Sequence, residues 1–168
     1  VHSAFPVSRF FGLERGFELY DDELPDGGTE RSGTATTARA RDYLARVTRR
    51  PLFLWVHYYE PHEPYAPPEP FRSRFRDTPY LGEIAAMDQQ LGRLVEAFER
   101  RAPGPVAIVV AGDHGEGLGD HGESLHGNLI YQSTMHVPMA LVEPGVSPED
   151  VDRPVSTLPL SGMRSGST

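Results

Sequence analysis

The sequence predicts an α/β fold with a mostly parallel sheet, because two short apolar runs are each preceded by a segment with helical periodicity. The runs are Leu52–Val56 and Val106–Ala111, and both are continuously apolar. Such runs are typical of strands that are buried on both faces of a parallel sheet. The order strand, helix, strand further implies a right-handed crossover between parallel strands.

Two segments have apolar residues spaced three and four apart, the pattern that places one apolar stripe on a helix. The first spans residues 36–49 and carries its stripe at Ala40, Tyr43, Leu44 and Val47. The second spans residues 81–101 and carries its stripe at Leu81, Ile84, Met87, Leu91, Leu94, Val95 and Phe98. The arginines of the first helix, Arg39, Arg41 and Arg46, are expected in solvent.

Composition narrows the classes of function. The formal net charge is -8, with 24 acidic against 16 basic residues, so nucleic acid is not expected as a partner. The absence of cysteine excludes disulfides, thiolate metal ligands and a cysteine nucleophile within these 168 residues. No apolar stretch approaches the roughly 20 residues that span a bilayer, so no membrane segment is expected. The localisation stays open.

Polar side chains follow both predicted strands. Residues 57–68 come after the first and are rich in proline, which predicts an ordered but irregular loop. Asp113 and His114 come after the second, with a glycine on either side. Ligands of open parallel sheets bind outside the carboxyl ends of the strands. A carboxylate and an imidazole there suit a divalent ion that has further oxygen ligands; a glycine turn with a surface histidine is the alternative interpretation.

The pentapeptide Gly-Asp-His-Gly-Glu occurs twice, at residues 112–116 and 119–123. Only the first copy follows an apolar run, so Asp113 and His114 are the predicted metal ligands. The other polar residues of the two copies are interpreted as loop or supporting groups: Glu116, Asp120, His121 and Glu123. His126 is a candidate for contacting an anionic substrate or protonating a leaving oxygen, with a surface histidine as the alternative.

Two further acidic positions are interpreted without a catalytic role. Asp21 and Asp22 lack a preceding apolar strand, which favours a solvated turn. Asp88 lies among the apolar residues of the second helix, which predicts a partly buried carboxylate bonded to a neighbouring loop.

Several segments resemble, in order, the sulfatase family. They are residues 11–21, 51–57, 60–65, 80–92, 111–123, 126–127 and 137–138. The resemblance implies a partial catalytic domain over residues 3–150, followed by an irregular tail, residues 151–168, that would be truncated or frame-shifted. It implies part of the alkaline-phosphatase-like three-layer sandwich, with its mostly parallel sheet.

The same resemblance implies hydrolysis of a small-molecule or glycan sulfate ester, with a formylglycine nucleophile and a divalent ion, calcium above others. Asp113 and His114 would be metal ligands. His62 and His126 would be catalytic residues that contact the sulfate, and His121 would be a substrate-binding residue.

The chain departs from the family in its nucleophile. No Cys/Ser-x-Pro-x-Arg motif is present, since Thr157–Ser161 lacks both the first residue and the arginine. The early acidic pair of the metal site is also missing. We therefore expect a fragment, inactive alone, whose nucleophile lies upstream. A phosphonate or phosphodiester hydrolase or a phosphoethanolamine transferase of the same superfamily, and a non-catalytic anion-binding module, stay open as alternatives.

Overall fold

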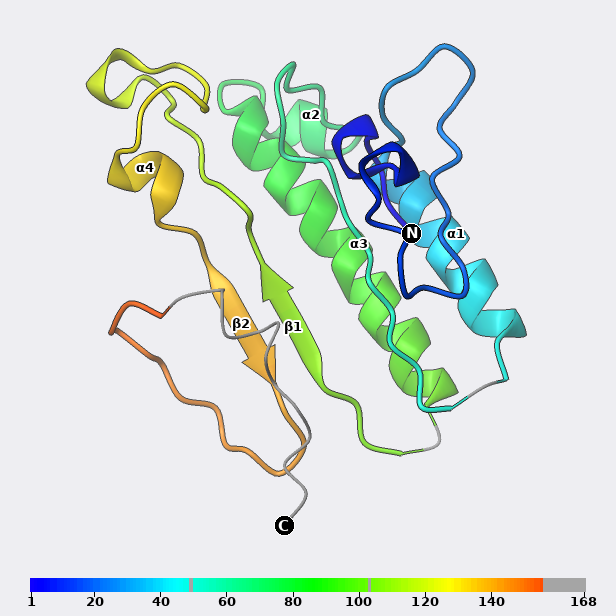
Figure 1. Ribbon diagram of the computed structural model, residues 1–168. Coiled ribbons are helices and arrows are strands. Elements are labelled where there is room, and N and C mark those ends of the chain that lie inside the picture. The colour runs from blue at the N-terminus through cyan, green and yellow to red at the C-terminus, as the bar shows by residue number, and fades with distance from the viewer. Residues whose placement is uncertain (49, 103, 156–168) are drawn as a thin grey trace. The chain divides into compact units, whose positions relative to one another are not determined.

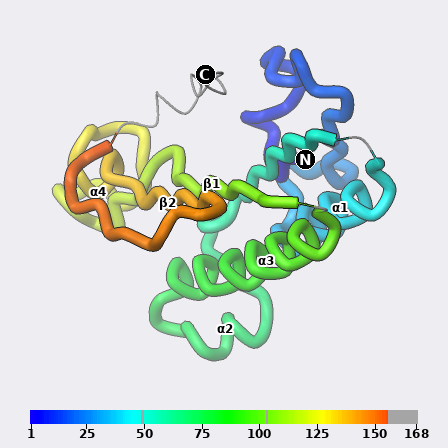
Figure 2. Tube along the Cα trace, turned by 90° about the horizontal axis from the view of Figure 1, so that it is seen from below, coloured from blue at the N-terminus to red at the C-terminus, as the bar shows by residue number. Residues whose placement is uncertain are grey.

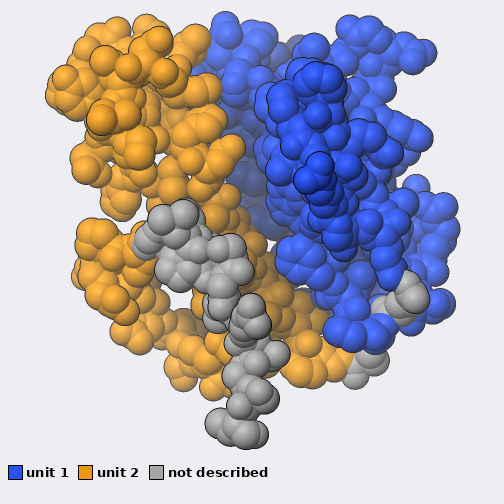
Figure 3. All heavy atoms as spheres, viewed as in Figure 1, with its two compact units in different colours: residues 1–103 blue, residues 104–168 orange. Residues whose placement is uncertain are grey.

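The computed structural model describes residues 1–48, 50–102 and 104–155. The chain forms two compact units, unit 1 with residues 1–103 and unit 2 with residues 104–168, which Figure 3 shows in different colours.

Unit 1 is built on two helices, α1 (Gly33–Arg46) and α3 (Pro79–Arg101), which lie side by side in Figures 1 and 2. Both predicted helices are thereby confirmed, although α1 begins and ends three residues earlier than expected. The Ser32 hydroxyl caps α1 by accepting from the Ala35 amide at 3.4 Å, and a proline opens α3. The short helix α2 (Phe71–Arg74) and the 3-10 turns η1 (Phe5–Val7) and η2 (Arg9–Phe11) complete the unit.

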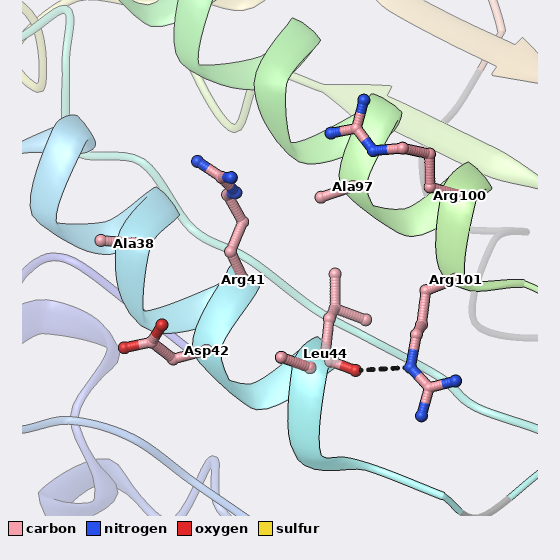
Figure 4. Close-up of a pocket in the computed structure, with 8 residues that line it drawn as sticks. Ala38, Arg41, Asp42, Leu44, Ala97, Arg100 and Arg101 are labelled. Atoms are coloured by element: carbon pink, nitrogen blue, oxygen red, sulfur yellow. Dashed lines mark hydrogen bonds between the residues drawn. The ribbon is translucent and has the colours of Figure 1, made fainter.

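The core of unit 1 lies between α1 and α3. Its buried residues are Ala40, Leu44 and Leu94. Arg101 joins the two helix ends, because its Nε donates to the Leu44 carbonyl at 3.1 Å (Figure 4). Its Nη2 donates to the Val47 carbonyl at 3.0 Å. Carbonyls at the end of a helix have no partner within the helix, so this cation satisfies them.

Residues 52–56 form no strand in the structure, so the first predicted strand is not observed. The run still has two faces. Leu52, Leu54 and Val56 pack against the core of the two helices, whereas Phe53 is 76% exposed. Burial on both faces is therefore wrong for this run, because a parallel strand needs a backbone neighbour on each side and further side chains above it.

Val1 supplies a one-residue neighbour to this run. Its amino group donates to the Trp55 carbonyl at 3.0 Å, and its carbonyl accepts from the His57 amide at 3.0 Å. One residue bonded to positions i−1 and i+1 of a neighbour is the hydrogen-bond pattern of parallel strands.

In unit 2, β1 (Ile108–Ala111) pairs antiparallel with β2 (Met139–Val142), from Ile108 opposite Val142 to Ala111 opposite Met139. The apolar run 106–111 is thus a strand, but its neighbour runs the other way. Within the described residues the one named sheet has these two strands, so the mostly parallel sheet of a three-layer sandwich is not observed. Residues 112–138 connect the two strands and contain the 3-10 turn η3 (Asp120–Gly122) and the short helix α4 (Gln132–Met135). Antiparallel strands can pair without the long crossover helix that a parallel pair needs.

The acidic pair Asp21–Asp22 is not the solvated turn that the sequence predicted. Both side chains are largely buried by arginines. Asp21 accepts from Nη2 of the buried Arg31 at 2.8 Å, and Asp22 accepts from Nε of Arg9 at 2.8 Å. Asp88, predicted to be partly buried, is exposed on α3. Spacing along the chain revealed neither the arginine partners nor the face of α3 that Asp88 occupies.

The ion pair of Asp22 predicts a pH-dependent stability. Hydrogen bonds from Arg9 lower the pKa of Asp22 from 3.8 to about 2. A carboxylate with a lowered pKa stabilises the folded chain above its unfolded pKa and loses that contribution as the pH falls through its folded pKa. The difference in urea midpoint between the wild type and Asp22→Asn should therefore be largest above pH 4 and shrink towards pH 2. A difference independent of pH would contradict the pair.

Residues 151–155 of the predicted tail are exposed and have neither helix nor strand, and residues 156–168 lie outside the described part of the chain. Among the helices of the described residues, none combines the length and the apolar character that crossing a bilayer requires.

Candidate functional site

The predicted metal ligands lie directly after β1. Gly112 donates from its amide to the Pro138 carbonyl at 3.2 Å, which fixes the point where the chain leaves the strand. Asp113 and His114 follow, and both side chains are exposed. The Asp113 carboxylate accepts from the His114 amide at 3.1 Å. The strand end therefore presents a carboxylate and an imidazole next to each other.

The His114 ring is oriented by its own backbone. Its Nδ1 lies 2.8 Å from the Gly115 carbonyl, which only accepts, so the proton sits on Nδ1. In the neutral ring this leaves the lone pair on Nε2, which lies 4.0 Å from Asp113 Oδ1. A metal-bound histidine commonly donates its other ring nitrogen to a carbonyl in this way.

The pair fits a divalent ion as part of its ligand set. Ligand atoms that each lie about 2.1–2.6 Å from one ion are separated by up to about 5 Å, and 4.0 Å is within that span. In the residues that the structure describes, no group of three or more His, Asp or Glu side chains is arranged to hold a metal. Asp113 and His114 thus offer two ligands, and calcium takes six to eight.

His126 lies against this pair. Its ring stacks on the His114 ring, with centroids 4.0 Å apart and planes 28° apart. Its Nδ1 is 3.1 Å from Oε1 of Glu116, whose carboxylate is buried. Three predicted site residues, Asp113, His114 and His126, are therefore brought together at one strand end.

Two glycines, Gly115 in the first motif copy and Gly117 directly after it, are required by close packing. A Cβ at Gly115 would lie 2.1 Å from the Ser133 carbonyl oxygen, and one at Gly117 would lie 2.3 Å from the Glu123 carbonyl oxygen. Their amides donate to the carbonyls of Thr134 and Leu125, at 2.8 and 2.7 Å. The loop that carries His126 is thus packed directly on the backbone of residues 115–117.

The second motif copy has different surroundings. His121 has a positive φ of 50° and stacks on Tyr131, with centroids 3.7 Å apart and planes 9° apart. Asp120 lies 3.0 Å from His121 Nδ1, and the hydrogen bond from that ring lowers the pKa of Asp120. The buried Glu123 accepts from the amides of Asn128 and Leu129 at 2.9 and 3.2 Å. Glu123 therefore organises the loop beyond it.

His62 belongs to unit 1, in the proline-rich loop, which is irregular as predicted. Its ring stacks on Tyr59, with centroids 4.1 Å apart and planes 21° apart. Nδ1 lies 2.7 Å from the Glu63 carbonyl, and Nε2 lies 3.1 Å from the Tyr59 hydroxyl. The ring is therefore held on three sides by its own loop.

Sequence reasoning missed two residues that fix the loop of His62: Tyr59, which stacks on the His62 ring, and Glu83, which lies under the loop. Neither carries a signal in the sequence, because these contacts depend on how the loop folds. Glu116, interpreted from the sequence as a loop or supporting group, contacts His126.

A hollow on unit 1 contains none of the predicted site residues. It lies between α1 and α3, and Figure 4 shows its wall of Arg41, Asp42, Arg100 and Arg101.

Comparison with known proteins places the chain in a family. A family model described as Sulfatase matches residues 1–160. The "Uncharacterized sulfatase YidJ" of Escherichia coli (strain K12) is 24% identical over 163 residues, covering 73% of this chain and 33% of that protein. Iduronate 2-sulfatase of Homo sapiens is 33% identical over 85 residues, covering 49% of this chain and 15% of that protein.

One solved structure has a similar fold. It is the crystal structure of Ps i-CgsB in complex with k-i-k-neocarrahexaose, with a TM-score of 0.58 and 19% sequence identity over 86% of this chain and 38% of that one. The chain thus spans a third or less of the two curated relatives and less than half of the solved one.

Proposed function

Because the chain belongs to the sulfatase family, we propose that its parent protein hydrolyses sulfuric esters and that these residues supply part of the catalytic domain. The observation that carries the proposal is the cluster of Asp113, His114 and His126 at the end of β1. A carboxylate and two imidazoles at one strand end are suited to a metal and an anionic ester together.

Asp113 and His114 would hold a divalent ion, calcium above others, through Oδ1 and Nε2. Such an ion offsets negative charge on the sulfuryl group and on the leaving oxygen. The chain's own contribution is orientation: the Gly115 carbonyl fixes the His114 ring, and the Asp113 carboxylate is held by the His114 amide.

The histidines would contact the sulfate. The buried Glu116 carboxylate orients the His126 ring through Nδ1, which turns Nε2 away from Glu116 as the atom that would face the ester. His62 would donate from Nε2 to a sulfate oxygen once its ring is protonated, replacing the Tyr59 hydroxyl as partner. His121 would add a further contact to the substrate.

The nucleophile, a formylglycine, would come from elsewhere in the parent protein. The 168-residue chain alone is therefore inactive under this proposal. The substrate would be a small-molecule or glycan sulfate ester. The structure of Ps i-CgsB holds a carrageenan oligosaccharide, which supports the glycan option.

Phosphorus chemistry is the second candidate. A phosphonate or phosphodiester hydrolase, or a phosphoethanolamine transferase, would use a similar Asp-His pair with related metal chemistry. A non-catalytic anion-binding module is the third candidate, and a parent protein without a Cys/Ser-x-Pro-x-Arg motif upstream of these residues would favour it.

A comparison of substrates tests the proposal. The parent protein should hydrolyse 4-nitrophenyl sulfate faster than bis(4-nitrophenyl) phosphate, lose turnover in EDTA and regain it with Ca²⁺, whereas the 168-residue chain should turn over neither. Faster diester turnover would favour phosphorus chemistry. Turnover by the isolated chain would contradict its assignment as an incomplete site, and a parent protein that binds sulfate without turnover would favour the binding module.

A further inference from the structure

The His62 loop is tied to helix α3 by one buried carboxylate. Glu83, in the second turn of α3, is 4% exposed. Its Oε2 accepts from the His62 amide at 3.1 Å, and its Oε1 accepts from the Ala66 amide at 2.7 Å. One side chain therefore holds both ends of the five-residue segment 62–66.

The helix surface next to Glu83 is shaped for the same loop. A Cβ at Gly82 would lie 2.9 Å from Pro67 Cγ and 3.1 Å from Phe75 Cβ, so the loop rests directly on α3. Pro67 is buried at this contact. The loop is thus fixed by packing at Pro67 and by hydrogen bonds to Glu83.

Burial of the Glu83 carboxylate is unfavourable unless its two oxygens accept hydrogen bonds. Burial raises the pKa of Glu83, and the two backbone hydrogen bonds from Ala66 and His62 oppose that rise. A buried carboxylate without partners is strongly disfavoured. The two amides are therefore partners that the carboxylate requires, and the loop conformation that supplies them is selected along with it.

That conformation also decides the state of the His62 ring. The bond from Nδ1 to the Glu63 carbonyl lies within the segment 62–66, whose two ends Glu83 holds. The same turn places Nε2 at the Tyr59 hydroxyl. Fixing the backbone of residues 62–66 thus fixes which ring nitrogen carries the proton.

We infer that Glu83 is a positioning residue for His62, because it holds both ends of the segment in which the His62 ring meets the Glu63 carbonyl, the arrangement from which the ring would reach a sulfate ester. The part of this inference that concerns the sulfate ester rests on the proposed function. Glu83 acts through the backbone of His62 and touches no substrate.

The test replaces Glu83 with glutamine in the 168-residue chain. Glutamine keeps the size of the side chain but has one acceptor oxygen in place of two. The His62 and Ala66 amides each donate to a separate oxygen of Glu83, so one of them would lose its acceptor. Long-range ¹H–¹⁵N spectra should show neutral His62 protonated on Nδ1 in the wild type and a shift towards Nε2 protonation in Glu83→Gln. The His62 and Ala66 amides should exchange about tenfold faster with solvent. Glu96→Gln, an exposed position on the same helix, is the matched control and should change neither.

If Glu83→Gln does not fold, measurements on the wild-type chain still test the inference. In the wild-type chain, the His62 and Ala66 amides should be protected from exchange and His62 should be protonated on Nδ1. Unprotected amides, or a tautomer that is unaffected in a folded Glu83→Gln, would overturn the inference.

Kinetic measurements on the parent protein distinguish a failure of the inference from a failure of the proposed function. Glu83→Gln should lower its kcat/KM for 4-nitrophenyl sulfate by about tenfold to hundredfold. If the wild-type parent hydrolyses no sulfate ester while the His62 tautomer still changes in the chain, the proposed function fails and the positioning role stands.

Discussion

Replacing Asp113 with alanine in the parent protein should lower kcat/KM for a sulfate ester by roughly a thousandfold. Asp113 would supply the charged oxygen of the metal pair, and His114 alone would be left with an exposed imidazole. A metal that neutralises charge in the transition state contributes several kcal/mol, and each 1.36 kcal/mol corresponds to about a factor of ten. The metal content of the purified variant should fall together with its activity.

The duplicated motif provides the control. Asp120 occupies the same position in the second copy, but it pairs with His121 and lies outside the predicted ligand pair. Asp120→Ala should therefore reduce kcat/KM by no more than about tenfold, through the orientation of His121, and should leave the metal content unchanged. Equal losses of metal in the two variants would contradict the assignment of the metal to the first copy.

Replacing Gly117 with alanine should destabilise unit 2 by about 3 kcal/mol. The new Cβ would lie 2.3 Å from the Glu123 carbonyl oxygen and 2.6 Å from the Leu125 carbonyl oxygen. Backbone atoms cannot rotate away as a side chain does, so the loop must shift and break the 2.7 Å bond from the Gly117 amide to Leu125. His126 follows Leu125 and should lose its place against His114.

The measurement combines urea denaturation, followed by far-UV circular dichroism, with hydrogen exchange at the Gly119 amide, which donates to Glu123 at 2.8 Å. Gly104→Ala is the matched control in the same unit, because no atom lies within 4 Å of its added Cβ and its φ is not positive. It should change stability by less than about 0.5 kcal/mol. Equal effects of the two substitutions would show that close packing at Gly117 is not the cause.

Features that depend on neighbouring residues could be predicted from the sequence. Helices α1 and α3 follow from the three-and-four spacing of residues such as Leu44 and Leu94, and both form the core as that spacing requires. The irregular loop at residues 57–68 follows from its prolines. The family, too, could be recognised from short ordered motifs, and the family model matches residues 1–160.

Features that depend on distant residues could not be predicted. An apolar run indicates burial but not its neighbour, so β1 was assigned a parallel partner and has the antiparallel β2. The acidic pair Asp21–Asp22, for which the lack of a preceding apolar strand predicts a solvated turn, is neutralised by Arg9 and Arg31, which lie about ten residues away along the chain.

The candidate site shows the same division. The sequence by itself determined that a carboxylate and an imidazole, Asp113 and His114, stand together at a strand end, because that is a matter of adjacent residues. The two identical motif copies are indistinguishable by composition. Only the tertiary structure decided that the first copy meets His126 and the second meets Tyr131, and that Glu83 holds His62, because such contacts are made by residues that folding brings together.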